Sequence, residues 1–419
     1  MVDLVEGLSA RAAALRLLGA ALEGRRGLEG ALAATEFRRL PARDRGFARA
    51  LVMMTLRRLG PIDRALDARL SREPPRPVRD ILRLGAAQAW FMGTPDFAAV
   101  STSVDLAPQS FRGLVNAVMR HLARDGEPAS NGEDLAPTWL LARWRVAYRP
   151  EAALLIAAQI RAEPQTDLTP RSPPDTSLVE RLEAQGLPGG TLRTGRRGDP
   201  AAWPGYAEGD WWVQDAAAAI PARLLAARSG ETALDLCAAP GGKTLQLASA
   251  GAKVTALDRS AGRLRRIATG LKRTGLAAEL VVADALAWTD GRHFDAVLLD
   301  APCSGTGTFR RHPDVLWNVR PSDIATLAGV QSRLLAAAAS RVRSGGRLVY
   351  SVCSLEPEEG EAQVGAFLKS RSDFELSAIE AGEGGAPAES LAAGGWLRIL
   401  PFQRDGGLDG FFIARFSRN

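Results

Sequence analysis

The chain has 419 residues, of which 46% are hydrophobic and 24% are charged, so it can build packed cores and we expect two or three domains. It contains no apolar run of about 18 residues and begins without a signal-peptide pattern, which argues against a membrane-spanning or secreted protein. The three cysteines are typical of a reducing, cytoplasmic compartment. Together with the three histidines they lack zinc-site spacing, so we expect no metal.

Positive charge is concentrated at the front of the chain. The formal net charge is +6 overall, whereas residues 1–125 alone hold 20 arginines, no lysine and 13 acidic residues. Basic segments attract polyanions, and the planar guanidinium group pairs well with phosphate. The pattern favours a polyanion-binding front segment, and the alternative is a solvated helical surface.

Apolar residues recur at intervals of three and four over this front segment, which is typical of amphipathic helices. Proline and glycine interrupt the pattern at residues 60–61, 74–75 and 93–95. The sequence therefore predicts an all-α bundle over residues 1–125.

Two less regular segments follow the bundle. Residues 126–136 are polar and rich in glycine, proline and acidic residues, so they predict a linker. A helical stretch and then a region dense in proline and glycine follow it. We expect residues 137–214 to form a small α+β module that binds RNA, and residues 215–419 to form a third domain.

In the third domain, short apolar runs alternate with helical patterns. The runs predict strands at residues 232–237, 253–257, 280–283, 296–299 and 347–352. Strands separated by helices indicate a Rossmann-like α/β fold with a parallel, doubly wound sheet. The last two runs, WLRILPF and GFFIARF, predict an antiparallel pair, which is typical of the methyltransferase variant of this fold.

Reactive side chains follow the predicted strands. These are Cys237, Asp258, Asp284, Asp300, Cys303 and Cys353. Because ligands bind at the carboxyl ends of strands in open α/β sheets, we expect these side chains to share one site. The alternatives are that the cysteines are small buried hydrophobic residues and that the acids cap the following helices.

The stretch AAPGGKT at residues 238–244 joins the first strand to its helix, and its glycines would let the backbone approach a ligand closely. A P-loop would need glycine at the position of Cys237, and a dinucleotide loop would need GxGxxG. The pattern instead favours a nucleoside cofactor without pyrophosphate. Asp258 would accept hydrogen bonds from ribose hydroxyls and Asp284 from an adenine amino group, which fits S-adenosyl-L-methionine.

Three blocks, LDLCAAPGGKT, LLDAPCSGTGTFRRHPDVLW and YSVCSLEPEEGE, resemble the signature motifs of the RNA 5-methylcytosine methyltransferases. The front stretches ARDRGFARALV, VRDILRLGAAQAW and FRGLVNAVMRHL resemble the NusB-type RNA-binding bundle, so the whole chain is similar to the Sun/RsmB type. The resemblance implies an S-adenosylmethionine-dependent catalytic domain at 215–419. It also implies methylation of cytosine C5 in RNA, expected to be 16S ribosomal RNA, free or in an early small-subunit particle.

The resemblance also implies residue roles. Cys353 would be the nucleophile and Cys303 the thiol that assists release. Cofactor contacts are implied for Cys237, Ala238, Ala239, Pro240, Gly241, Gly242, Lys243, Asp258, Asp284 and Asp300. The chain departs from the family pattern at Gly360, where the family usually has Asn.

The chemistry gives a reason for these residue types. A thiolate that adds to C6 of cytosine activates C5 towards the methyl group, and a cationic neighbour such as Lys243 would favour the thiolate. Asp300, in its protonated form, would stabilise charge at the pyrimidine N3.

The sequence also has two alternative interpretations, each from another function class. One is a non-catalytic, antitermination-type RNA-binding regulator with a vestigial sheet domain, against which the intact Lys243, Asp300, Cys303 and Cys353 argue. The other is a two-cysteine redox enzyme, which would be expected to contain C-x-x-C.

Within the methyltransferase interpretation, the roles of Cys303 and Cys353 could also be reversed, since Cys303 follows a proline as the nucleophile of DNA cytosine methyltransferases does. The expected partner is RNA, with no DNA and no membrane.

Overall fold

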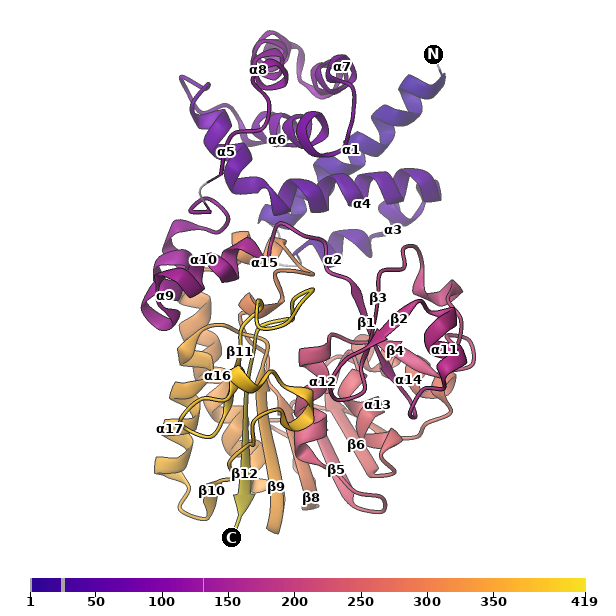
Figure 1. The fold of residues 1–419 in the computed structure, drawn as a ribbon, viewed down its shortest axis with the longest axis vertical. Helices are drawn as coiled ribbons and strands as arrows, with labels where there is room; N and C mark the ends of the chain where they lie inside the picture. The colour runs from indigo at the N-terminus through magenta and orange to yellow at the C-terminus, as the bar shows by residue number, and fades with distance from the viewer. Residues whose placement is uncertain (1, 24–26, 131) are drawn as a thin grey trace. The chain divides into compact units, whose positions relative to one another are not determined.

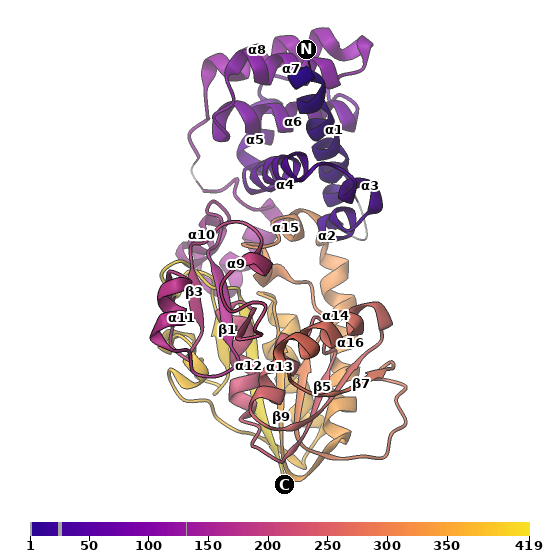
Figure 2. The same cartoon turned by 90° about the vertical axis from the view of Figure 1, so that its right-hand side faces the viewer.

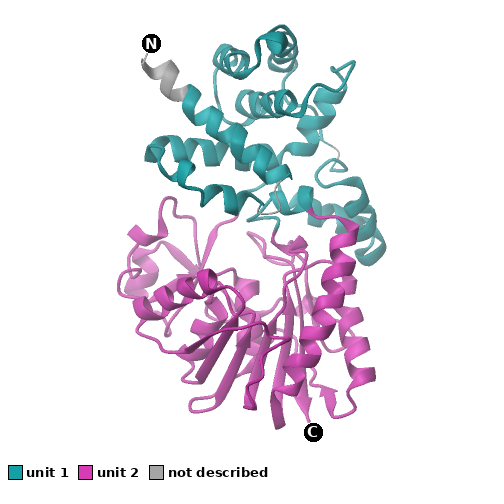
Figure 3. Cartoon of the chain, turned by 180° about the vertical axis from the view of Figure 1, so that it is seen from behind, with its two compact units in different colours: residues 1–163, 309–318 teal, residues 164–308, 319–419 magenta. Residues whose placement is uncertain are grey.

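The computed structural model describes residues 2–23, 27–130 and 132–419. The remaining positions, residues 1, 24–26 and 131 of the predicted bundle and linker, lie outside the described residues. The chain forms two compact units, coloured separately in Figure 3. Residues 1–163 and 309–318 make up the first, here called the helical unit, and residues 164–308 and 319–419 make up the second, the sheet unit. No described helix is long and apolar enough to cross a membrane.

The helical unit contains the predicted bundle (Figure 1). Its α-helices are α1 (Val2–Glu23), α2 (Gly27–Leu32), α3 (Thr35–Arg38), α4 (Ala42–Arg57), α5 (Leu59–Asp67), α6 (Arg76–Phe91), α7 (Asp96–Leu106), α8 (Arg112–Asp125), α9 (Thr138–Tyr148), α10 (Pro150–Ala158) and α15 (Asp314–Asn318). The predicted interruptions fall at the start of α5, before α6 and between α6 and α7, so the helical periodicity and its breaks are confirmed.

Helix α6 shows how sequence and packing agree. It begins directly after Pro75, ends shortly before Gly93, and buries the apolar side chains of its inner face. A Cβ atom added at Gly85 would lie 2.5 Å from both Met119 Sδ and Ser103 Oγ. Gly85 therefore lets α6 pack closely against α7 and α8, although glycine in a helix interior costs about 1 kcal/mol relative to alanine.

Residues 309–318 belong to the helical unit although they lie between two elements of the sheet unit in sequence. The Phe309 ring lies 6.0 Å from the Trp144 ring, and Trp317 Nε1 donates to the carbonyl of Leu56 at 3.1 Å. The Arg57 guanidinium donates to the carbonyl of Arg310 at 2.7 Å. The block FRRHPDVLW therefore contributes to the packing of the helical unit.

The sheet unit begins with a small four-stranded antiparallel sheet in the order β2-β3-β1-β4. Its elements are β1 (Thr166–Pro170), α11 (Thr176–Arg181), β2 (Ala184–Gly186), β3 (Leu192–Thr194) and β4 (Trp211–Val213). A buried ion pair joins Arg193 Nε on β3 to Asp167 Oδ1 on β1 at 2.7 Å. The same guanidinium donates to the carbonyls of Asp405 and Gly407, each at 2.8 Å, and so fixes the loop that precedes the last strand.

The larger sheet has the strand order β10-β12-β9-β8-β5-β6-β7, with β11 pairing with β12. Its strands are β5 (Thr232–Leu236), β6 (Lys253–Asp258), β7 (Glu279–Val282), β8 (Phe294–Asp300), β9 (Val342–Val352), β10 (Phe374–Leu376), β11 (Leu397–Ile399) and β12 (Phe411–Arg418). The five strands β5 to β9 are mutually parallel, as predicted. The predicted antiparallel pair at the end of the chain is β11 and β12.

Helices cover both faces of this sheet, as Figure 2 shows from the side. They are α12 (Ala216–Leu225), α13 (Gly242–Ser249), α14 (Ala261–Thr274), α16 (Pro321–Ser340) and α17 (Glu361–Ser370). Alternate residues of β8 enter different cores: Val297 and Leu299 pack with α16 and α17, whereas Ala296 and Leu298 pack with α12. Strands buried on both faces read as continuous apolar runs, which is why the sequence revealed them.

Candidate active site

The strand order places a topological switch point between β5 and β8. The chain proceeds from β5 to β6 and β7 on one side, and then crosses to β8 and β9 on the other. In such sheets the connections diverge at the switch point and leave a crevice at the carboxyl ends of the strands, where ligands bind. The loop after β5 and the end of β8 flank this crevice.

The loop after β5 contains two residues in the left-handed region of backbone conformation. Cys237 and Gly241 have φ angles of 60° and 111°, and α13 begins at Gly242. A Cβ atom at Gly241 would lie 2.9 Å from Ile267 Cγ1 on α14, so a larger residue would be both strained and crowded. The loop therefore lies close over α14, with the first N–H groups of α13 at its end.

Lys243 and Asp300 connect the two sides of the switch point. The Lys243 ammonium lies 2.7 Å from Asp300 Oδ2, and Ser351 Oγ donates to Asp300 Oδ1 at 2.8 Å. Lys243 is largely buried and also lies 5.4 Å from the centroid of the Phe411 ring. The pair brings one acidic and one basic group together at the carboxyl end of β8.

The two cysteines predicted to react lie side by side. Cys303 Sγ and Cys353 Sγ are 3.4 Å apart, and both residues are free thiols that follow the neighbouring strands β8 and β9. The contact with Cys353, together with burial, raises the pKa of Cys303 well above the usual thiol value. Burial in a low-dielectric environment disfavours the charged thiolate of Cys303. Cys303 is therefore better suited to holding a proton than to attacking a substrate.

Cys237 has a different environment from the other two cysteines. Burial, and then the carboxylates of Asp258 and Asp300, raise its pKa to about 12. Cys237 therefore stays a protonated thiol. This agrees with a residue that lines the crevice and not with a nucleophile.

The predicted acids lie at the carboxyl ends of three parallel strands, of which β6 and β7 are neighbours and β8 is separated from β6 by β5. Asp258 ends β6 and is buried, with its carboxylate accepting from the N–H of Ala239 at 3.3 Å and from the N–H of Ser260 at 2.9 Å. Arg263 Nη1 lies 3.2 Å from Asp258 Oδ2. A carboxylate offers about four acceptor positions, so these contacts leave capacity for a ligand hydroxyl.

Asp284 is exposed and lies two residues beyond β7. Its Oδ1 accepts from the N–H of Leu286 at 2.9 Å, and the N–H of Ala283 donates to the carbonyl of Asp258 at 3.3 Å. The backbone contact brings the Asp284 turn beside the end of β6. The Asp284 carboxylate also caps its own turn through the N–H of Leu286, as expected from the alternative interpretation of these acids as caps.

The arrangement fits a nucleoside cofactor of the S-adenosylmethionine type. The N–H groups in the first turn of α13 lack acceptors within the helix and can receive a carboxylate, while Asp258 and Asp284 offer acceptors to hydroxyl and amino groups. The loop residues 237–243 provide backbone close to the crevice. No larger anion site is needed, because such a cofactor carries no phosphate.

Several polar residues of the site were not predicted from the sequence. They are Asp235, Arg263, Ser304, Ser351, Ser354, Glu359 and Arg398. Burial raises the pKa of Asp235 to about 7, although the Thr244 hydroxyl donates to it at 2.6 Å. The only sequence signal for this group was that all of its members except Arg263 and Arg398 lie inside the motif blocks.

Gly360, where the family usually has Asn, is explained by its neighbours. A Cβ atom there would lie 2.4 Å from Arg398 Nη2 and 2.7 Å from Phe412 Cγ. The Arg398 guanidinium donates to the carbonyl of Ser354 at 2.5 Å and pairs with the carboxylate of Glu361. In this chain the arginine occupies the space beside the turn that follows Cys353, and glycine leaves room for it.

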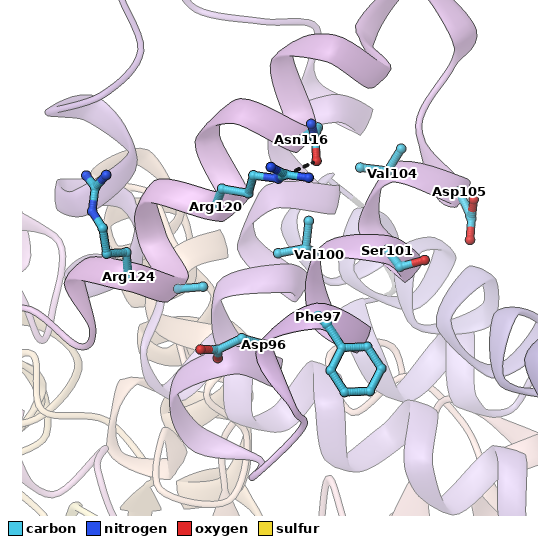
Figure 4. Close-up of a pocket in the computed structure, with 10 residues that line it drawn as sticks. Asp96, Phe97, Val100, Ser101, Val104, Asp105, Asn116, Arg120 and Arg124 are labelled. Carbon is cyan, nitrogen blue, oxygen red and sulfur yellow. Dashed lines mark hydrogen bonds between the residues drawn. The ribbon is translucent and has the colours of Figure 1, made fainter.

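A separate pocket lies in the helical unit between α7 and α8 (Figure 4). Its charged lining residues are two acids and two arginines, Asp96, Asp105, Arg120 and Arg124, so the lining has no net charge. None of the predicted site residues lines it, and its balanced charge favours no particular ligand.

Comparisons with known proteins identify the family of the chain. A family model described as 16S rRNA methyltransferase RsmB/F matches residues 222–417, and the NusB family model matches residues 8–124. The ribosomal RNA small subunit methyltransferase B of Xanthomonas campestris pv. campestris is 37% identical over 432 residues, which cover 97% of each chain. The protein of the same name from Pseudomonas syringae pv. tomato is 35% identical over 441 residues, covering 98% of this chain and 97% of that one.

Solved structures show the same fold. A methyltransferase homolog protein from Pyrococcus horikoshii is 26% identical with a TM-score of 0.57, over 70% of this chain and 100% of that one. The crystal structure of NSun6 from Pyrococcus horikoshii with SFG gives a TM-score of 0.60 at 20% identity, over 67% of this chain and 98% of that one. The predicted α/β methyltransferase fold behind a NusB-like bundle is therefore confirmed, and the chain belongs to the 16S rRNA methyltransferase RsmB/F family.

Proposed function

We propose that this protein transfers a methyl group from S-adenosylmethionine to C5 of a cytosine in 16S ribosomal RNA. The observation that carries the proposal is the pair of thiols 3.4 Å apart, next to the Lys243–Asp300 pair at the switch point of a methyltransferase sheet. A pyrimidine carbon that is weakly nucleophilic needs a covalent activator, and a thiol at this position supplies one. The names of the full-length relatives support ribosomal RNA as the substrate.

The proposed reaction begins at Cys353. Its thiolate forms a bond to C6 of the cytosine, and the electron pair displaced from the C5–C6 double bond makes C5 nucleophilic. The bound cofactor supplies an electrophilic methyl group on a sulfonium. C5 takes that methyl group, and the electron pair of the broken S–C bond stays on the departing sulfur, leaving a neutral thioether.

The remaining steps use the neighbouring groups. Asp300 is proposed to protonate the pyrimidine N3 while the ring carries the adduct, with Lys243 at 2.7 Å as the source of its proton. A base then removes the C5 proton, the C5–C6 double bond re-forms, and the Cys353–C6 bond breaks. Cys303, whose raised pKa keeps it protonated, lies at the right distance to return a proton to the departing thiolate.

The RNA partner is proposed to contact the helical unit as well as the sheet unit. The NusB family match and the seven excess positive charges of residues 1–125 support a polyanion-binding role for the first. RNA is recognised mainly at unpaired loops and ends, where a cytosine can leave its stack and enter the crevice.

Bisulfite sequencing of 16S ribosomal RNA tests the proposal directly. Cells with the protein should carry one or more protected cytosines that become convertible when the gene is deleted, and purified protein with S-adenosylmethionine should restore the protection. An unchanged bisulfite pattern would instead favour the rival function, a non-catalytic RNA-binding regulator.

A further inference from the structure

A fully buried carboxylate, Glu359, lies between the two cysteine-bearing turns. Its side chain has no exposed surface, and it belongs to the short turn between β9 and α17. Buried carboxylates are costly unless hydrogen bonds compensate for the lost hydration, so the partners of Glu359 indicate why it is there.

Each partner of Glu359 belongs to the structure around the thiols. Oε1 accepts from the N–H of Ser304 and from Gln331 Nε2, both at 2.9 Å. Oε2 accepts from Ser304 Oγ and from Ser354 Oγ, both at 2.5 Å. Ser304 directly follows Cys303, and Ser354 directly follows Cys353.

The backbone alone does not hold these turns together. The ladder between β8 and β9 ends at Asp300 and Ser351, two to three residues before the thiols. Beyond that point Glu359 joins the turn after β8 to the turn after β9 through its side chain. The two turns also bond directly, from Gly307 N to the carbonyl of Cys353 at 3.0 Å, from Leu355 N to Thr306 Oγ1 at 2.9 Å, and between the hydroxyls of Ser304 and Ser354 at 3.2 Å. Gln331 Nε2 also donates to the carbonyl of Pro302 at 2.9 Å, so α16 supports the same turn.

We infer that Glu359 is a positioning residue for the reaction, which holds Cys303 and Cys353 at the separation that the two-thiol chemistry needs by binding the serine after each of them. The inference rests on the proposed function, because it assigns Glu359 a part in the use of both thiols. Holding reacting groups in place is worth a large rate factor, and a misplacement of about 1 Å can cost about 100-fold.

The charge of Glu359 has a second effect on the same pair. A negative carboxylate near Cys303 disfavours its thiolate, and Glu359 is among the causes that raise the pKa of Cys303. A neutral residue of the same shape should therefore let Cys303 ionise at lower pH. This effect separates Glu359 from a residue that only stabilises the fold.

The experiment compares three purified full-length variants with the wild type. Glu359→Gln removes the charge and keeps the shape, Glu359→Asp keeps the charge and shortens the reach, and Glu375→Gln neutralises an exposed carboxylate on the edge strand β10 as a matched control. The probes are S-adenosylmethionine with a 16S ribosomal RNA transcript for kcat and KM, and iodoacetamide with peptide mass spectrometry for the pH profile of each cysteine.

The expected results differ between the variants. Glu359→Gln and Glu359→Asp should lower kcat by about 100-fold with little change in KM. Glu359→Gln should also move the alkylation of Cys303 to lower pH, whereas Glu359→Asp should leave that profile near the wild type. Glu375→Gln should match the wild type in both measurements. Should Glu359→Gln fail to fold, the kcat of Glu359→Asp decides the inference.

The two levels of the argument can fail separately. Wild-type kcat and a wild-type Cys303 alkylation profile in Glu359→Gln would overturn the positioning role, with the proposed function intact. A wild type that methylates no cytosine would overturn the proposed function, and the alkylation profiles would still report whether Glu359 acts on Cys303.

Discussion

Cys303 Sγ and Cys353 Sγ lie 3.4 Å apart at the ends of neighbouring parallel strands, although 49 residues separate them in sequence. The parallel register of β8 and β9, in which Asp300 lies opposite Ser351, produces this contact. Both thiols can therefore reach one small ligand, and the proposed mechanism requires that each does a different task.

Removal of each thiol should give a different phenotype. Cys353→Ala should abolish both turnover and the covalent protein–RNA adduct, because no thiolate remains to attack C6. Cys303→Ala should form the adduct and release it slowly, so a slower-migrating protein–RNA band should accumulate on denaturing gels when S-adenosylmethionine is present. The measurement is the gel band together with methyl incorporation.

The double variant Cys303→Ala/Cys353→Ala serves as the control without either thiol. A band that appears with Cys353→Ala and is absent with Cys303→Ala would reverse the two roles. Retention of full activity in both single variants would exclude covalent catalysis by these cysteines.

The loss of Asp258 should weaken cofactor binding. Its carboxylate is the buried acceptor at the end of β6, and Asp258→Ala should reduce the affinity for S-adenosylmethionine by about 1–3 kcal/mol, the cost of leaving hydrogen-bonding groups unpaired. Calorimetric titration of the purified protein measures this, with thermal unfolding to verify that the variant is folded. Unchanged affinity in Asp258→Ala, or tighter binding of NAD by the wild type, would contradict the cofactor assignment.

The sequence predicted the strands, the helices and the position of the loop because these depend on local patterns. Strands that are buried on both faces are apolar throughout, and the residues directly after them must meet at one sheet edge, so Asp300, Cys303 and Cys353 could be placed together. This reasoning needs only the order of strands and helices along the chain.

The polar residues that support the thiols could not be predicted in the same way. Arg398 lies on β11 and reaches the carbonyl of Ser354 only because β11 pairs with β12. Both strands come long after Ser354 in the sequence. Residues 309–318 pack within the helical unit for a similar reason, since Trp317 bonds to the carbonyl of Leu56 across 261 positions. Such contacts depend on tertiary packing, which periodicity does not encode.

Gly360 should tolerate no side chain, in contrast to a glycine one turn further on. Gly360→Ala would bring a Cβ atom against Phe412 Cγ and the Arg398 guanidinium, so it should destabilise the protein by about 1–3 kcal/mol. Gly365 lies in α17 with no atom within 4 Å of an added Cβ, so Gly365→Ala should stabilise by about 0.5–1 kcal/mol. Denaturant unfolding of both variants provides the comparison, and equal stabilities would contradict the packing argument.

Asp235 should make stability depend on pH. Burial raises its pKa in the folded protein to about 7, whereas in the unfolded chain it ionises near pH 4. The unfolded state thus releases the proton first, so the stabilising contribution is complete below about pH 4 and is lost as the pH rises to about 7. Asp235→Asn cannot ionise, and the stability difference between the variant and the wild type should grow from pH 5 to pH 7. A difference that stays constant over this range would show that Asp235 is already ionised in the folded protein.

RNA binding by the helical unit should depend on the arginines of α3 and α4. Arg38, Arg39, Arg43 and Arg49 are exposed, and no acidic partner is found for them among the described residues. Three arginines around α5 and α6, of which Arg64 is exposed and the other two are half-buried, are instead paired: Arg64 with Asp134, Arg69 with Asp125, and Arg76 with Glu23. Three arginines taken from each set therefore offer unequal free charge to a phosphate backbone.

Two triple variants with the same change in net charge test this difference. Arg38→Gln/Arg39→Gln/Arg43→Gln should weaken binding to a 16S ribosomal RNA transcript and make its salt dependence shallower by about 2 in log–log slope, because three phosphate contacts no longer release counterions. Arg64→Gln/Arg69→Gln/Arg76→Gln removes the same charge from paired positions and should leave the slope near that of the wild type. Equal slopes for the two variants would mean that only net charge matters, and a wild-type slope in the first variant would mean that α3 and α4 do not contact the RNA.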